Sequence, residues 1–261
     1  AEPLDILGMP EIRLTVCSSM PSAHLVARLS ALDPNGIPCL ISWGALNLTH
    51  RTSHAAPEPL EPGRPYSVRL ELKATGYRVS AGHRLRLTIG TAHWPLIWPA
   101  PDAGELTVVS GGEPAACLQL PLAPTAQEPA RALKATPPDV TWVGEYNEQK
   151  PIWTLTDDVL SGSHTVTIFG GDDQKLPNGT RLAASEDIRL TARPLDPAHT
   201  TLYNRVDYVL EQDGRKIDVR STGTVESDHD TLEASLRLEV DLDGERFFER
   251  EWQERIARTF C

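Results

Sequence analysis

Apolar and polar residues alternate with a period of two along most of the first half of the chain. The pattern is clear over residues 12–16, 66–72 and 85–89. Such alternation is typical of β-strands that bury one face. Turn-forming sequences separate the runs, namely Asp33-Pro34-Asn35-Gly36, Glu61-Pro62-Gly63 and Ala81-Gly82. Short strands at this spacing predict a β-sandwich over residues 1–122.

A longer alternation fills the second half of the chain. Residues 232–242 place Leu, Ala and Val on one face and mostly charged residues on the other. Asp213-Gly214 and Asp243-Gly244 each separate two alternating runs, and Asp-Gly in this position is a strong signal of a β-hairpin. We therefore predict four long antiparallel strands over residues 200–258, with one polar face open to water. They form part of a C-terminal antiparallel β extension over residues 140–261.

The two β-rich parts are separated by a segment of different composition. Residues 123–139 are rich in Pro and Ala and lack hydrophobic periodicity. This composition predicts a linker or a crossing segment between two domains. The fold class predicted from the sequence is therefore all-β.

One short segment combines aromatic residues and prolines. TAHWPLIWPAP, residues 91–101, directly follows a predicted strand. Proline does not occur in central strands, and Trp carries a large apolar surface that is usually packed. We expect a rigid segment here, with Trp94, Pro95, Trp98 and Pro99 as candidate contacts with another domain. The alternative is that both Trp side chains only close one end of the sandwich.

Charge and cysteine content narrow the classes of partner. The chain has 25 Lys and Arg against 36 Asp and Glu, for a net charge of −11. This balance argues against nucleic acid and against an anionic membrane as partners. No apolar run approaches the roughly 18–20 residues of a membrane helix.

The four cysteines form no Cys-x-x-Cys motif and no secretory signal precedes them, so we expect free thiols in the cytoplasm. Because the chain does not begin with Met, we expect a fragment or a processed product.

Motifs for self-contained catalysis are missing. No Ser has Gly two positions before it, so there is no Gly-x-Ser-x-Gly nucleophile turn, and His-Glu-x-x-His, P-loop and Gly-x-Gly-x-x-Gly motifs are also absent. His50 and His54 would share a metal only on a helix, and nearby prolines predict a loop. We therefore predict no catalytic residues, no cofactor and no metal in this chain.

Three groups of acidic residues also raise the question of a site. Asp172, Asp173 and Asn178 suggest a calcium loop, but the required order of oxygen ligands is missing. The acidic residues near the second hairpin, Asp241, Asp243 and Glu245, are explained by the turn itself. Glu145 and Glu148 lie near Trp142 and Tyr146 and invite comparison with a catalytic carboxylate pair. Solvated polar turns and loops are the simpler interpretation of all three groups.

Several segments together resemble a known family. They are LDILGMPEIRLTVCSS (4–19), LVARLSALDPNG (25–36), WGALNLTHR (43–51), LEPGRPYSVRLEL (60–72) and SAGHRLRLTIGTAHWPLIWPAPDAG (80–104). In this order they resemble the C-terminal, non-catalytic β-sandwich of the X-prolyl dipeptidyl peptidase and cocaine esterase group, the CocE/NonD hydrolases of peptidase family S15. L-x-P-G-x-x-Y and A-G-H-R-L-R-L are the most typical fragments. LDPAHTTLYNRVDYVLEQDG (195–214) and FFEREWQERIAR (247–258) look like the extension of longer members, with Arg250, Trp252, Ile256 and Arg258 matching an R-x-W…I-x-R pattern.

The resemblance implies a bacterial hydrolase whose Ser-His-Asp triad lies in an α/β-hydrolase domain absent from this chain. The part present here would be a jelly-roll of the galactose-binding-like type, which packs on that domain and helps to wall its substrate pocket. The reaction would be acyl transfer from an ester or an amide to water. Two alternatives stay open. One is a free-standing carbohydrate-binding module that uses Trp43, Trp94 or Trp98, and the other is a structural part that joins copies of the chain through the C-terminal sheet.

Overall fold

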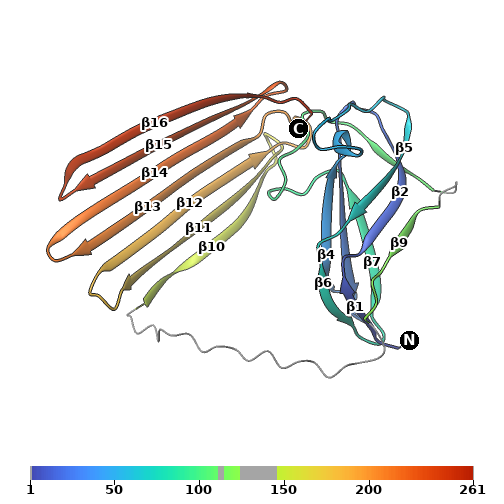
Figure 1. Cartoon of the computed structure of the whole chain (residues 1–261), viewed down its shortest axis with the longest axis horizontal. Coiled ribbons are helices and arrows are strands. Elements are labelled where there is room, and N and C mark those ends of the chain that lie inside the picture. The colour runs from blue at the N-terminus through green and yellow to red at the C-terminus, as the bar shows by residue number, and fades with distance from the viewer. Residues whose placement is uncertain (1, 111–114, 124–145, 261) are drawn as a thin grey trace. The chain divides into compact units, whose positions relative to one another are not determined.

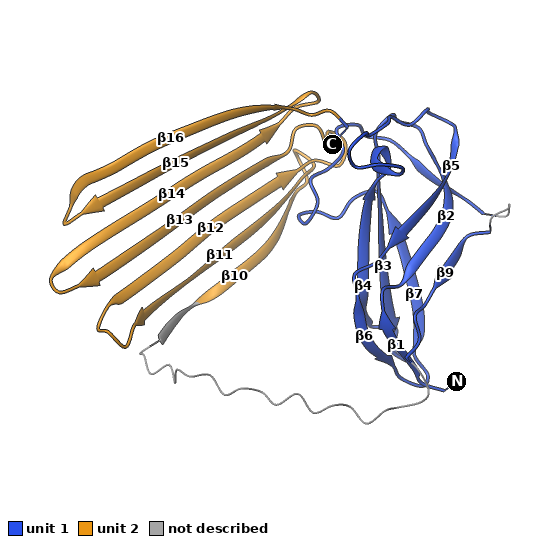
Figure 2. Ribbon diagram, viewed as in Figure 1, with its two compact units in different colours: residues 1–132, 260–261 blue, residues 133–259 orange. Residues whose placement is uncertain are grey.

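The computed structural model describes residues 2–110, 115–123 and 146–260, with the backbone alone for 146–149. These residues form an all-β protein, as the sequence predicts. The chain divides into two compact units, residues 1–132 with 260–261 and residues 133–259 (Figure 2). Most of the predicted linker, 124–139, lies outside the described residues.

Unit 1 consists of short strands that form several antiparallel sheets (Figure 1). Its described strands are β1 (Leu4–Gly8), β2 (Glu11–Ser18), β3 (His24–Leu32), β4 (Pro38–Asn47), β5 (Pro65–Glu71), β6 (Thr75–Val79), β7 (Arg84–Gly90), β8 (Leu106–Val109) and β9 (Cys117–Gln119). One sheet has the order β5-β2-β8, and β9 also pairs with β2. A second has the order β4-β3-β7, and β1 pairs with β6. The jelly-roll connectivity stays a prediction.

The core of unit 1 is apolar and contiguous. It is built mainly from the inward faces of β2, β3 and β5, and alternate residues of β2 such as Ile12, Leu14 and Val16 are almost fully buried. Burial of one such side chain contributes roughly 1.5–3 kcal/mol before entropy is counted. The alternation in the sequence is therefore the direct cause of the sandwich.

A bulge in β4 changes which side chains face the core. Leu29 pairs with Ser42 while the next residue of β3 pairs with Leu40, so Ile41 is the extra residue. Ile41 and Ser42 are both buried, whereas Trp43 lies beside the exposed Arg28 on the outer face. An extra residue reverses the two-residue alternation beyond it. The bulge thus directs Trp43 away from the core.

In its described residues, unit 2 is a single antiparallel sheet of seven long strands in sequence order (Figure 1). They are β10 (Tyr146–Asp158), β11 (Ser163–Lys175), β12 (Arg181–Ala192), β13 (Thr201–Gln212), β14 (Arg215–Ser227), β15 (Thr231–Leu242) and β16 (Glu245–Ala257). The four strands predicted over 200–258 are confirmed as β13–β16. Both Asp-Gly pairs have positive φ at both residues, as type I′ hairpin turns require.

The two faces of the unit 2 sheet differ in character. One face carries networks of arginine and carboxylate side chains: Arg181 pairs with Asp173 and Glu211, and Asp207 pairs with Arg205 and Arg220. The opposite face, here called the apolar face, carries the other half of each alternation. The sequence predicts that such a face packs on a core, yet among the described residues its side chains stay largely half-buried or exposed.

Arg258 explains part of the C-terminal sequence pattern. Its side chain is buried, and Nη1 donates to the carbonyls of Ala198 at 3.2 Å and Asp228 at 2.7 Å. These carbonyls lie in the loops after β12 and β14. Arg258 therefore ties the end of β16 to two other connections of the same sheet.

Helical structure is minimal in the described residues. One 3-10 turn, η1 (Leu48–His50), is capped by Asn47, whose side chain accepts from the Thr49 backbone N–H at 3.0 Å. Over the described ranges, no helix is long and apolar enough to cross a membrane.

Candidate functional site

The aromatic segment forms an ordered turn after β7. The Ile97 N–H donates to the His93 carbonyl at 3.0 Å, and the Trp94–Pro95 peptide bond is cis. The Trp94 and Trp98 rings meet edge to face, with centroids 6.1 Å apart and planes at 71°. This is a favourable arrangement for two aromatic rings. The structure therefore brings together the two tryptophans that the sequence singles out.

Burial within this turn is uneven. Trp94, Pro95, Trp98 and Pro99 are all half-buried. Leu96, which the sequence analysis did not single out, is 61% exposed at the tip between the two tryptophans. The Trp94 indole N–H is buried and lacks an acceptor within the described residues. The turn thus presents one apolar side chain on a rigid aromatic base.

A second aromatic contact joins the turn to the sandwich. The Trp43 and His93 rings stack with centroids 4.8 Å apart and planes 9° from parallel. The Lys73 ammonium lies 4.2 Å from the Trp43 ring centroid, a cation–π contact. The Lys73 N–H also donates to the Trp43 carbonyl at 2.9 Å. From the sequence, Trp43 is a candidate for sugar binding, but its contacts with His93 and Lys73 are not predicted, because they depend on the bulge in β4.

The electrostatics of this surface follow from the same packing. Burial lowers the pKa of His93 below 6.5, and the positive charge of Arg28 lowers it further. His93 is therefore a neutral aromatic ring at neutral pH. The Leu96 tip, the two tryptophans and the Trp43–His93 pair, with Lys73 and Arg28 nearby, form what we call the Trp surface. Its polar groups are the Lys73 ammonium, the Arg28 guanidinium and the neutral His93 imidazole.

The two histidines considered as metal ligands do come together. The His50 and His54 Nδ1 atoms are 3.3 Å apart, and the segment is a 3-10 turn followed by a loop. A metal site needs further ligands. Over the residues that the structure describes, there is no group of three or more His, Cys, Asp or Glu side chains able to hold an ion.

The calcium-loop candidates in unit 2 are held apart. Asp172 and Asp173 are neighbours in β11, so their side chains point to opposite faces. Asp173 pairs with Arg181, and the Asn178 side chain accepts from the Thr180 N–H at 3.1 Å. These contacts are ordinary strand and turn interactions.

The acidic residues at the second hairpin also have structural partners. Asp243 is in the turn and accepts from the Lys216 backbone N–H at 2.7 Å. Asp241 pairs with Arg246 across the sheet. The proposed carboxylate pair cannot be placed, because Trp142, Glu145 and the side chains of Tyr146 and Glu148 lie outside the described residues.

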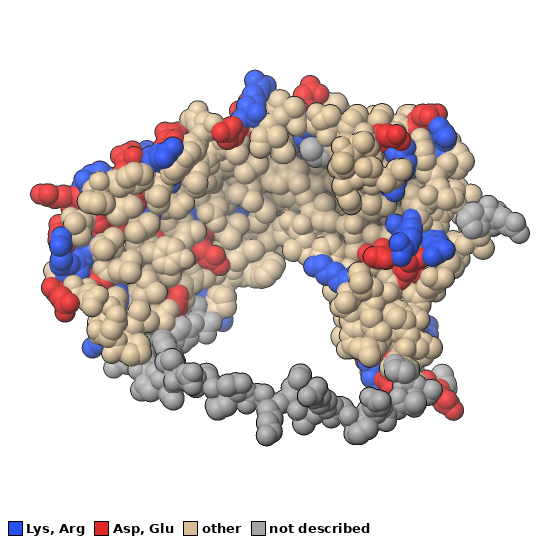
Figure 3. Space-filling view, viewed as in Figure 1, with Lys and Arg blue, Asp and Glu red and all other residues tan. Residues whose placement is uncertain are grey.

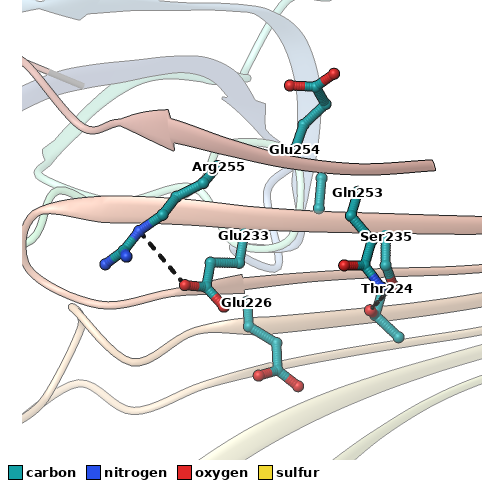
Figure 4. Close-up of a pocket in the computed structure, with 8 residues that line it drawn as sticks. Thr224, Glu226, Glu233, Ser235, Gln253, Glu254 and Arg255 are labelled. Atoms are coloured by element: carbon teal, nitrogen blue, oxygen red, sulfur yellow. Dashed lines mark hydrogen bonds and ion pairs between the residues drawn. The ribbon is translucent and has the colours of Figure 1, made fainter.

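A hollow of about 450 Å³ lies on the polar face of unit 2 (Figure 4). Glu233 and Arg255 form an ion pair at 3.5 Å beside it, and the Thr224 and Ser235 hydroxyls hydrogen-bond at 2.7 Å. Figure 4 shows that Glu254 points away from this group. The hollow follows from the alternation of β14, β15 and β16, and two pairs of its lining side chains contact each other.

Exposed His–Asp contacts occur in unit 2, two of them between residues that are not adjacent in sequence. The imidazoles of His164 and His199 hydrogen-bond to Asp157 and Asp196 at exposed positions. Among the described hydrogen bonds, neither of these two imidazoles also contacts a serine hydroxyl. A Ser-His-Asp triad, in which the imidazole hydrogen-bonds to both partners, is therefore not formed at His164 or His199.

Two curated proteins of known activity are similar in sequence to part of this chain. Cocaine esterase from Rhodococcus sp. (strain MB1 Bresler) is 26% identical over 94 residues, which are 36% of this chain and 16% of the esterase. Xaa-Pro dipeptidyl-peptidase from Pediococcus pentosaceus is 44% identical over 50 residues, 19% of this chain and 6% of the peptidase. The chain thus spans a small part of the length of these curated relatives.

A solved structure of an alpha-amino acid ester hydrolase superposes with a TM-score of 0.45 and 20% identity, over 47% of this chain and 24% of that one. The family match is more specific. Residues 1–128 match the X-Pro dipeptidyl-peptidase C-terminal non-catalytic domain. This range contains all of the described strands of unit 1 and the whole Trp surface. The N-terminal half of the chain therefore belongs to the X-Pro dipeptidyl-peptidase C-terminal non-catalytic domain family.

Proposed function

We propose that the chain is the accessory C-terminal region of a serine hydrolase of the CocE/NonD group. In this proposal, unit 1 packs on an α/β-hydrolase domain that supplies the Ser-His-Asp triad. The observation that carries the proposal is the family match over residues 1–128, since the matched domain is defined as non-catalytic. The small share of each relative that is covered also fits an accessory role.

We propose the Trp surface as the contact with the catalytic domain. Leu96 is an exposed apolar side chain on a rigid base, and such a residue can fill a pocket without much loss of conformational entropy. In this proposal the half-buried Trp94, Pro95, Trp98 and Pro99 form the rest of the contact around Leu96. The same surface would then border the substrate pocket.

The first test of this proposal reads the coding sequence upstream of Ala1. A hydrolase domain with a Gly-x-Ser-x-Gly turn supports the proposal, and a native chain that begins near Ala1 overturns it. In the parent enzyme, Leu96→Asp should lower domain association and hydrolysis of p-nitrophenyl acetate and of an Ala-Pro p-nitroanilide. Leu160→Asp is the matched control, because Leu160 is a fully exposed leucine in unit 2.

The carbohydrate-binding alternative has less support from the geometry. A sugar stacks on a free aromatic face, but Trp43 already contacts His93 and Lys73, and Trp94 contacts Trp98. Titration of galactose and of mixed glycans against intrinsic Trp fluorescence tests it. A saturable change that Trp43→Ala removes would favour that function over hydrolase docking.

Two further parts of the proposal concern assembly and compartment. The uncovered apolar face of unit 2 favours self-association of the chain as a second role. We also place the protein in the cytoplasm, because Cys17, Cys39 and Cys117 are free thiols and a reducing compartment keeps them so.

A further inference from the structure

The middle of the apolar face of unit 2 carries no charge between the hairpin turns. Three adjacent strands, β13, β14 and β15, contribute only apolar and small neutral side chains to it; Arg215, at the turn, pairs with Asp243. The residues are Leu202, Asn204, Val206, Tyr208, Leu210, Ile217, Val219, Ser221, Gly223, Val225, Ser227, Leu232, Ala234, Leu236, Leu238, Val240 and Leu242. In Figure 3 the charged side chains of unit 2 gather mainly along its margin.

This face is open to solvent among the described residues. Tyr208, Leu236 and Phe248, which lie on three different strands, are each more than 40% exposed. Strand spacing and rise make the area from β12 to β16 roughly 19 Å by 37 Å, or about 700 Å². That area is close to the ~800 Å² that each partner buries in a stable interface. An exposed apolar face of this extent indicates an interaction surface.

Three charged side chains border this area away from the turns, Glu186 on β12 and Arg250 and Glu254 on β16, and two of them share a row. Cross-strand pairing runs from Glu186 through Val206, Ser221 and Leu238 to Arg250 in one row of the apolar face. Glu186 lies two strands to one side of β14, and Arg250 lies two strands to the other side. A neutral core between charged positions is the usual anatomy of a protein interface.

Glu186 and Arg250 differ from the charged residues of the opposite face. There, Arg181, Arg205 and Arg237 each pair with a carboxylate. Neither Glu186 nor Arg250 has an ion pair among the described residues, and the Arg250 guanidinium lies 4.9 Å from the Trp252 ring centroid. Two exposed, opposite charges on one face are therefore available to a partner.

We propose that this face binds a second copy of the chain, with a two-fold axis that runs parallel to β14 over Ser221. The idea rests on the self-association proposed above and is independent of the hydrolase contact in unit 1. Rotation about this axis exchanges the two sides of the sheet and preserves position along the strands. Glu186 of one copy therefore faces Arg250 of the other, and the second pair forms by symmetry.

Other two-fold arrangements lack this match. An axis in the same plane but perpendicular to the strands places Glu186 against Glu186 and Arg250 against Arg250. Like charges across an interface oppose association. Two sheets that pack with aligned strands lie about 10 Å apart, a gap that a Glu and an Arg side chain can span together. The match of Glu186 with Arg250 thus favours a second copy as the partner and this axis over the perpendicular one.

The test uses charge reversal in the 261-residue chain, followed by analytical ultracentrifugation at about 0.15 M salt, where long-range repulsion is screened. We expect a dimer of twice 28.6 kDa for the unmodified chain. Glu186→Arg and Arg250→Glu should each raise the dimer dissociation constant by about tenfold or more, since each dimer contains both pairs. The double variant should restore dimerisation. Arg255→Glu, on the polar face, is the control with the same charge change.

The possible outcomes distinguish a failure of self-association from a failure of this face or this axis. A monomer at 100 μM overturns self-association and the interface together. If neither charge reversal changes the dimer dissociation constant, or if the double variant does not restore dimerisation, this face or this axis is wrong. Self-association itself would still hold in that case. Leu236→Glu gives an independent check, because this exposed residue should abolish the dimer while circular dichroism and the unfolding midpoint of the monomer change little. None of these results bears on hydrolase docking, which the Leu96 variant tests.

Discussion

The indole of Trp43 and the imidazole of His93 lie face to face, 4.8 Å apart and almost parallel. The two residues are fifty positions apart in sequence, and their contact holds the aromatic turn against the outer face of β4. Because the stacked imidazole is partly buried, its protonation is linked to the stability of unit 1.

We predict that the stability of unit 1 depends on the protonation of His93. The pKa of His93 in the folded state is lowered from 6.5, mainly by burial and further by Arg28. The unfolded chain therefore binds more protons in this window, so the free energy of unfolding should fall as pH decreases from 6.5 through the lowered pKa. His93→Gln should flatten this dependence in urea denaturation measured between pH 7.5 and 5.

A second variant separates the two causes of the His93 shift. Arg28→Gln removes the nearby positive charge and leaves the burial, so it should weaken the dependence without abolishing it. An unchanged slope in both variants would show that His93 is not linked to the stability of unit 1.

The second prediction concerns acid unfolding. Glu11 is buried and accepts hydrogen bonds from Arg69 and Arg13, each at 2.6 Å, which lower its pKa from 4.5 to about 2. Its contribution to stability is present above pH 4.5 and should be lost as pH falls toward 2. Glu11→Gln should lower the melting temperature at pH 6. It should also reduce the amount by which the melting temperature falls between pH 4.5 and pH 2. Glu61→Gln, which removes only an exposed pair with Arg64, should change the melting temperature little.

The third prediction compares two glycines of unit 1. A Cβ at Gly44 would lie 2.6 Å from the Glu71 carbonyl oxygen, so the backbone must shift to admit it. Overpacking of this kind costs about 1–3 kcal/mol. At Gly76 the nearest atom is a Leu7 methyl at 3.7 Å, which is ordinary contact. Gly44→Ala should destabilise unit 1 strongly in denaturant titration and Gly76→Ala should not; equal effects would contradict the close approach.

The fourth prediction concerns Arg258. Its buried guanidinium donates to two backbone carbonyls, and loss of hydrogen bonds from a charged group costs roughly 1.5–3 kcal/mol each. Arg258→Ala should therefore destabilise unit 2 by at least about 2 kcal/mol. Arg255→Ala, three residues earlier and exposed, should change stability by less than about 1 kcal/mol. The measurement is urea unfolding of the full chain followed by Trp fluorescence.

The sequence predicts those parts of the fold that depend on local pattern. The even positions of β15 and the Asp-Gly turns at 213 and 243 define the hairpins of unit 2, because alternation and positive φ are properties of neighbouring residues. β10, β11 and β12 lie within the predicted β extension over 140–261, but their individual bounds were not predicted, since Gly170, Gly171 and Ala183–Ala184 interrupt a simple alternation there.

The candidate site was predictable only in part. The aromatic turn can be recognised in the sequence from the Trp and Pro residues within positions 91–101. The contact of His93 with Trp43 cannot be recognised in this way. Ile41 and Trp43 have the same parity, so alternation alone places both in the core. The extra residue of the bulge depends on pairing between strands, and no local pattern encodes it.

The order of strands in unit 2 bears on how this unit folds. Among the described strands of this sheet, each pairs with its neighbours in the chain and with no other. Such a sheet behaves as a one-dimensional series of nearest-neighbour interactions, so a hairpin formed anywhere can template the next strand in either direction. Amide hydrogen exchange should then slow from the outermost strands, β10 and β16, toward β13. Removal of an outer hairpin should leave the remaining ladder intact.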